Sequence, residues 1–134
     1  MALQLSVSAR NARLDAIETT AGTAALLKIY TGAQPASCAT AASGTLLATL
    51  TLPSDWMANA ASGSKAMSGT WSGSGAAAGT AGYFRILDST GTTTHLQGSI
   101  TATGGGGDMT LDNTSIANAQ AISISSFTLT DANS

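Results

Sequence analysis

Residues 121–130 read AISISSFTLT, and this stretch restricts how the chain can fold more than any other. Alternation of large apolar residues with serine and threonine is typical of a half-buried β-strand. The large residues nevertheless fall on two parities: Ile122 and Ile124 share one, and Phe127 and Leu129 share the other. All four face one core only if the strand contains a bulge, for which Ser125-Ser126 is the natural place, or if the strand passes from one sheet into a second.

Four other stretches alternate with a period of two: residues 26–31, 46–52, 83–88 and 92–100. Between the last two, Asp88-Ser89-Thr90-Gly91 predicts a tight turn, because the carboxylate can accept hydrogen bonds from the turn backbone and the glycine tolerates a positive φ. Pro53 ends the second stretch, since it has no N–H to donate. We therefore expect residues 23–134 to form a mainly β, antiparallel domain, a sandwich or jelly-roll rather than a barrel.

The period changes to 3.6 in residues 7–20, which predicts a short N-terminal α-helix within an arm of residues 1–22. Ser6 or Ser8 is expected to cap its start, and Gly22 its end. One face of this helix is apolar, consisting of Val7, Leu14, Ile17 and Ala21. Because this stripe is narrow, the helix needs something to dock against, and the arm and the β domain are expected to form one structural domain.

Residues 54–82 leave two interpretations open, namely two poor strands near 64–71 and 76–80, or one long surface loop. Trp56 and Trp71 lie in this part of the chain. They are expected to fill a core that has few other large residues, and the alternative is a platform on which sugars stack.

Three smaller segments complete the expected fold. Residues 36–43 are too small and polar to pack and should form a loop. Gly104–Gly107 predicts a hinge or turn. Residues 109–111 predict another short strand, which Ile116 ends or continues.

The composition excludes several classes of protein. More than half of the 134 residues are alanine, threonine, serine or glycine, so any core is thin. A net charge of −2 leaves no basic surplus for nucleic acid, and no apolar run is long enough to span a membrane. Met1 to Ala9 lacks the pattern of a secretory signal, and the single Cys38 excludes an internal disulfide framework.

Candidate chemistry is sparse, and we expect no catalytic residue, no cofactor and no metal. His95 falls on a predicted strand, facing outward, with no nucleophile or carboxylate at a motif spacing. Asp108 follows Gly104–Gly107 where a phosphate loop would have lysine and serine. Asp112 and Asn113 lack the alternating oxygens and terminal glutamate of a calcium loop. These patterns favour a structural or binding protein over an enzyme.

Several segments together resemble a family of small virion proteins from tailed bacteriophages. In chain order they are residues 9–17 (ARNARLDAI), 27–35 (LKIYTGAQP), 44–50 (GTLLATL), 79–88 (GTAGYFRILD) and the ending at 122–131. The resemblance spans most of the chain in the right order. It implies a structural virion protein, in particular a capsid decoration (cement) protein that binds the outer surface of the head and stabilises the major capsid lattice.

The resemblance also implies a setting. The expected partner is the major capsid protein, the expected location is the capsid surface of a virion made in the bacterial cytoplasm, and such proteins commonly have β-sandwich or jelly-roll cores and form dimers or trimers. The alternative is a tail, baseplate or receptor-binding component that recognises host surface glycans. The candidate partner-binding residues are Arg10, Leu14, Ile17, Trp56 and Trp71. The alternative is that the same helix face covers the protein's own sheet, and both interpretations stay open here.

Overall fold

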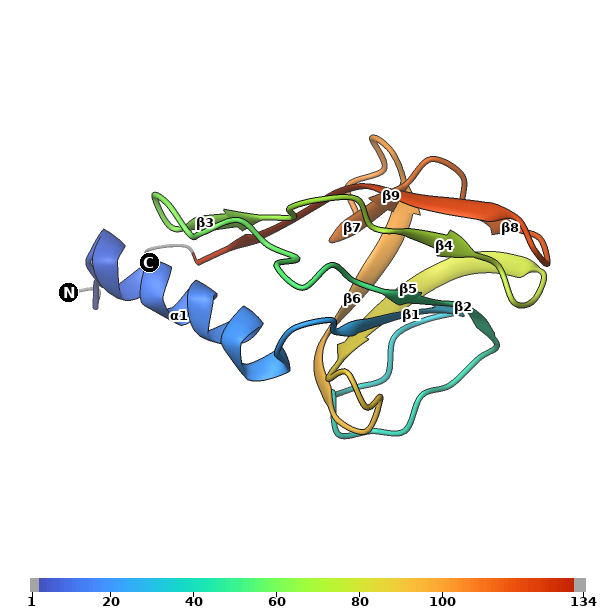
Figure 1. The fold of residues 1–134 in the computed structure, drawn as a ribbon, viewed down its shortest axis with the longest axis horizontal. Coiled ribbons are helices and arrows are strands. Elements are labelled where there is room, and N and C mark those ends of the chain that lie inside the picture. The colour runs from blue at the N-terminus through green and yellow to red at the C-terminus, as the bar shows by residue number, and fades with distance from the viewer. Residues whose placement is uncertain (1–2, 132–134) are drawn as a thin grey trace.

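A computed structural model describes residues 3–131 of the chain, and it is mainly β with one helix. The elements are α1 (Val7–Ala21), β1 (Leu26–Thr31), β2 (Leu46–Thr51), β3 (Ser64–Ala66), β4 (Ser72–Ser74), β5 (Gly79–Leu87), β6 (Thr94–Ala102), β7 (Met109–Leu111), β8 (Ser115–Ile116) and β9 (Ala121–Thr130). Figure 1 shows one curled sheet, with α1 standing at one end beside β3 and the end of β9.

Strand β9 contains a bulge, which is one of the two alternatives that its sequence left open, the other being a passage into a second sheet. Thr110 of β7 pairs with Ser126, whereas the next residue, Leu111, pairs with Ile124. Ser125 is therefore the extra residue, and the parity of the strand changes there. As a result the large residues of β9 reach the same core: Ile122, Ile124 and Phe127 are buried, and Leu129 packs against them.

The sheet has the strand order β2-β1-β5-β6-β7-β9-β3, while β4 pairs with β9 and β8 with β5. Its far ends approach each other, because the Ala76 N–H donates a 2.7 Å hydrogen bond to the Leu47 carbonyl and Ala48 forms a bridge with Gly75. The sheet thus curls into a half-barrel around the core. The mainly β prediction with a short helix is confirmed, but a sandwich or jelly-roll is not.

The prediction of a purely antiparallel sheet is wrong at β6 and β7, which pair in parallel, with Ile100 opposite Met109. Only residues 103–108 connect them, although parallel neighbours usually need a long crossover. The glycines make this reversal feasible: a Cβ on Gly105 or Gly107 would lie 2.7 or 2.9 Å from atoms of Thr101. The glycine run is therefore a tight turn that the parallel pairing requires.

The alternation predicted for residues 46–52 is also wrong at its start. Ile29 pairs with Ala48 and Tyr30 with Leu46, so Leu47 is a second bulged residue. Leu47 and Ala48 are both buried, whereas Leu46 is 37% exposed. A bulge rotates the residues before it by one position, which moves Leu46 to the solvent face.

The segment 54–82 contains strands, but they are shorter than predicted: β3, β4 and the beginning of β5. Both tryptophans lie in the core, Trp56 with 0% and Trp71 with 1% of their surface exposed. Their indole N–H groups have backbone acceptors, since Trp56 donates to the Gly22 carbonyl and Trp71 to the Trp56 carbonyl. The core interpretation of both residues is confirmed.

The loop of residues 32–45 lies over the outer face of β1 and β5, in the lower right of Figure 1. The Tyr83 hydroxyl donates to the Ser43 carbonyl at 2.6 Å and accepts from the Ser43 N–H. The Gln97 side-chain amide donates to the Pro35 carbonyl at 2.8 Å. The loop was expected not to pack, and it does not fill a core, but polar side chains of the sheet hold it in place.

Deleting Ser125 should leave the fold intact, because a regular strand would then place Ile124 and Phe127 two positions apart, on one face. We expect a loss of about 1–2 kcal/mol in the free energy of unfolding, from the hydroxyl contacts that Ser125 makes with Thr103 and Thr110. Deleting the exposed Ser123 instead should cost more than about 3 kcal/mol, because Ile122 then turns to solvent. Urea unfolding compares the two, and equal losses would contradict the bulge argument.

Candidate functional site

Helix α1 begins at the predicted residue and has caps at both ends that the sequence predicts. The Ser6 hydroxyl accepts a hydrogen bond from the Ala9 N–H, which makes Ser6 the N-cap. Gly22, at φ +87°, closes the last turn by donating its N–H to the Glu18 carbonyl. The helix runs one residue further than predicted, to Ala21.

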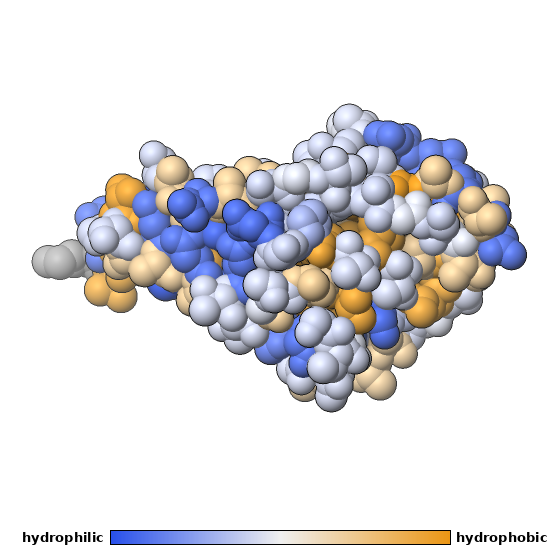
Figure 2. Space-filling model, in the orientation of Figure 1, coloured by the Kyte–Doolittle hydropathy of each residue, from blue (hydrophilic) through white to orange (hydrophobic). Residues whose placement is uncertain are grey.

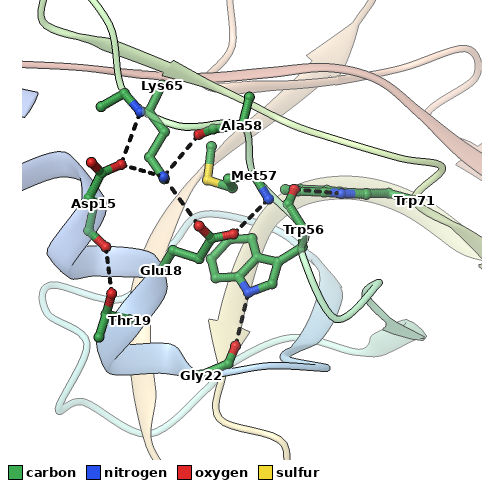
Figure 3. A network of polar contacts seen from close by, with 10 residues as sticks. Asp15, Glu18, Thr19, Gly22, Trp56, Met57, Ala58, Lys65 and Trp71 are labelled. Atoms are coloured by element: carbon green, nitrogen blue, oxygen red, sulfur yellow. Dashed lines mark hydrogen bonds and ion pairs between the residues drawn. The ribbon is translucent and has the colours of Figure 1, made fainter.

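A buried lysine fastens this helix to the β domain (Figure 3). Lys65 of β3 has a side chain that is only 1% exposed, and its Nζ lies 2.7 Å from Asp15 Oδ1 and 3.2 Å from Glu18 Oε1. Nζ also donates to the Ala58 carbonyl at 2.9 Å. Three acceptors therefore surround the ammonium group, which is what a buried cation requires.

The helix also accepts hydrogen bonds from the backbone of the segment that precedes β3. Glu18 Oε2 accepts from the Met57 N–H, Asp15 Oδ1 from the Ala60 N–H and Asn11 Oδ1 from the Gly63 N–H. Successive turns of α1 thus bind every third residue of one segment, from position 57 to position 63. Of the predicted apolar stripe, Leu14 and Ala21 are buried, and these polar contacts fix the same side of the helix.

The charges at this junction stabilise each other. The pKa of Lys65 is raised, because hydrogen bonds and attraction from Asp15 and Glu18 outweigh the burial that alone would lower it. The pKa of Asp15 is lowered, chiefly by its hydrogen bond from Lys65 and next by that from the Ala60 N–H.

The structure distributes the five predicted partner-binding residues between this junction and the core. Leu14 is buried against the protein's own fold, and both tryptophans are core residues. Arg10 donates to the Asp131 carbonyl at 3.1 Å. Ile17 is half-buried. Leu14, Trp56 and Trp71 therefore stabilise the chain itself, and of the five only Arg10 and Ile17 keep part of their side chains at the surface.

The opposite face of α1 is open to solvent. Ser8, Ala12, Ala16 and Thr20 follow one another at a spacing of four and are all exposed. Val7, predicted to belong to the apolar face, is 47% exposed. Figure 2 shows hydrophilic residues gathered over α1, and a mixture of weakly polar residues and hydrophobic patches over the sheet.

A shallow groove of about 200 Å³ separates this helix from β6. It is lined by Ala16, Ile17, Thr20 and His95. His95 was expected to face outward beside Gln97, and it lies half-buried in this groove. The groove therefore lies between the open face of α1 and the sheet.

Sequence reasoning missed two buried cations, Lys65 and Arg85. Both have a local signature, because each is a lone charge within an uncharged stretch, Arg85 in YFRIL and Lys65 between serine and alanine. Their partners are far away in the chain, and for that reason the sequence does not indicate what they bind.

No family model, curated protein or solved structure matches this chain. Within residues 3–131, no helix is long and apolar enough to cross a membrane. The same residues contain no cluster of three side chains that could hold a metal ion.

Replacing Lys65 by methionine should lower the free energy of unfolding at pH 7, because the carboxylates of Asp15 and Glu18 lose their cation. The depressed pKa of Asp15 contributes stability above the ordinary carboxyl pKa, and this contribution disappears as pH falls through the lower pKa of the folded state. K65M should therefore raise the pKa of Asp15 and reduce the loss of stability in acid.

Carbon-detected NMR titration of the side-chain carboxylates measures this change. Asp88 is an internal control, because its pKa is lowered by hydrogen bonds from Thr92 and Thr90, remote from Lys65. An unchanged pKa of Asp15 in K65M would show that the ion pair does not form in solution.

Proposed function

We propose that this protein is a structural component of a tailed-bacteriophage particle, a capsid decoration protein that binds the outer surface of the head and stabilises the major capsid lattice. The resemblance of five segments to small virion proteins supports this class. The mainly β domain with a short N-terminal helix is compatible with it. The proposal includes assembly as a dimer or trimer on the capsid surface.

The observation that carries the proposal is the way in which α1 is attached to the β domain. Buried polar contacts at Lys65 hold one face of the helix, while Ser8, Ala12, Ala16 and Thr20 on the other face are exposed. Short side chains permit close approach of a partner's backbone and lose little rotamer entropy on binding. A helix that is fixed in advance also loses little freedom when it docks. This geometry suits a protein whose work is to fit another protein's surface.

A lattice makes such a contact effective even when a single contact is weak. Linked protomers bind neighbouring capsid subunits with an effective concentration set by their spacing, so avidity exceeds the affinity of one contact. A protein that binds only the assembled shell shifts the equilibrium toward assembly. Stabilisation of the head then follows from mass action.

The alternative function, a tail or receptor-binding component that recognises glycans, relied on the ring faces of Trp56 and Trp71. Both rings are buried. The alternative thus loses the residues that favoured it, and the location of the protein in the particle decides between the two.

Purified particles should contain the protein in many copies, distributed over the head. Cryo-microscopy of the particle, with mass spectrometry of separated heads and tails, measures copy number and position. A few copies at the tail would favour the alternative function, and absence from particles would refute both.

Replacing Ala16 by arginine should weaken binding of the purified protein to isolated heads by about tenfold or more, because a bulky charge on the open face of α1 blocks close approach. Ala78, exposed in the loop before β5, offers a control that adds the same charge far from α1. Co-sedimentation with heads compares A16R with A78R. Equal binding by the two variants would exclude α1 as the contact element.

A further inference from the structure

Two cations lie side by side on the outer face of the sheet. Lys28 of β1 and Arg85 of β5 are directly opposite each other in the antiparallel register. Opposed residues of this kind project from the same face, and like charges there destabilise the pair. The ion pairs found within residues 3–131 involve Arg13 and Lys65, and neither Lys28 nor Arg85 takes part in one.

Arg85 is 4% exposed, so its charge is almost wholly removed from water. Nη2 donates to the Thr40 carbonyl at 2.6 Å and to the Ser37 carbonyl at 3.3 Å. Nε is buried without any hydrogen-bond partner. The carbonyls orient the guanidinium group, but they do not neutralise it.

The neighbouring side chain of Gln97 does not neutralise the charge of Arg85 either. Gln97 is opposite Arg85 on β6, and its Oε1 is likewise buried without a partner. An amide oxygen can satisfy a donor, but it carries no net charge. Burial of a cation without an anion is costly, as the contrasting arrangement at Lys65 with two carboxylates illustrates.

Arg85 lines an open cavity of about 490 Å³ beneath the loop of residues 32–45. The other walls are two short polar segments, residues 38–41 of that loop and Thr92–Thr94 before and at the start of β6. Threonine hydroxyls and a guanidinium group all donate hydrogen bonds, and together they suit an oxyanion. Arg85 lacks an anionic partner, and the cavity beside it has space for one.

Asp88 restricts the charge that this anion can carry. Its carboxylate accepts hydrogen bonds from the N–H groups of Thr92 and Thr93, so it lies beside two residues that line the cavity. A dianion such as phosphate would be repelled by it about twice as strongly as a monoanion. A carboxylate is a monoanion whose two oxygens match the planar guanidinium.

We propose that this cavity is a carboxylate-binding site in which Arg85, supported by Lys28 and the hydroxyls of Thr93 and Thr94, receives a single carboxylate group. That group comes from an acidic side chain of a docked protein or from a small free carboxylate. The site is on the sheet and not on α1, and it does not rest on the proposed function.

NMR titration of the full chain with acetate, with a blocked glutamate-containing tripeptide and with inorganic phosphate tests the proposal. We expect saturable shifts of the backbone amides of residues 38–41 and 92–94 and of the Arg85 Nε–H signal. Replacing Arg85 by glutamine should weaken carboxylate binding by about tenfold or more. Replacing Arg13, which is exposed on α1, by glutamine removes the same charge elsewhere and should leave binding unchanged.

The three probes separate the sources of the carboxylate. Stronger binding of the peptide than of acetate indicates a protein side chain, whereas binding of acetate alone indicates a free small carboxylate. Absence of saturable shifts, a preference for phosphate, or equal binding by R85Q and R13Q would overturn the proposal. If R85Q does not fold, the Arg85 Nε–H signal of the unaltered protein and the K28Q variant still decide, because Arg85 lines the cavity and Lys28 lies directly opposite Arg85 on β1.

Discussion

The structure depends on β9 placing its large apolar residues on one face, and with Ser125 present this requires a bulge. This strand pairs with β7 along one edge and with β3 and β4 along the other, so three strands take their register from it. Large apolar residues are scarce in this chain, and a regular strand would send half of those in β9 to solvent. The bulge at Ser125 brings Ile122, Ile124 and Phe127 to the same side, where Phe127 contacts Trp71 and Phe84. The core has few large residues, and it is complete because none of these three side chains points to solvent.

The two buried cations, Lys65 and Arg85, differ in whether an anion of the same chain neutralises them. Lys65 has two carboxylates from α1, and the result is a permanent junction between the helix and the sheet. Arg85 has only backbone carbonyls and an open cavity. The first arrangement is complete within the chain and serves its architecture. The second lacks an anion, and that deficiency is the physical basis for proposing a ligand.

The polar fastening of α1 also bears on the proposed role in a phage particle. Had the helix docked through a broad apolar stripe, its orientation would depend on nonspecific contact. Ion pairs and hydrogen bonds to the segment of residues 57–65 are directional, and they define which face of the helix remains outside. A defined outer face suits the repeated docking that we propose.

Local patterns by themselves determined the helix over residues 7–20, most of the strands and the turn at Asp88–Gly91, because each follows from periodicity, capping or turn chemistry within a few residues. The two parities in residues 121–130 left a bulge and a change of sheet open, and only the pairing with β7 showed the bulge at Ser125. Tertiary structure alone decided the parallel pairing of β6 with β7, the curl of the sheet and the short strands of residues 64–74, since these depend on contacts between distant segments of weak propensity. The candidate sites belong to the second group. Lys65 meets Asp15 across 50 residues and Arg85 meets Thr40 across 45, and no local rule in a chain of small residues predicts which distant acceptors a lone cation will find.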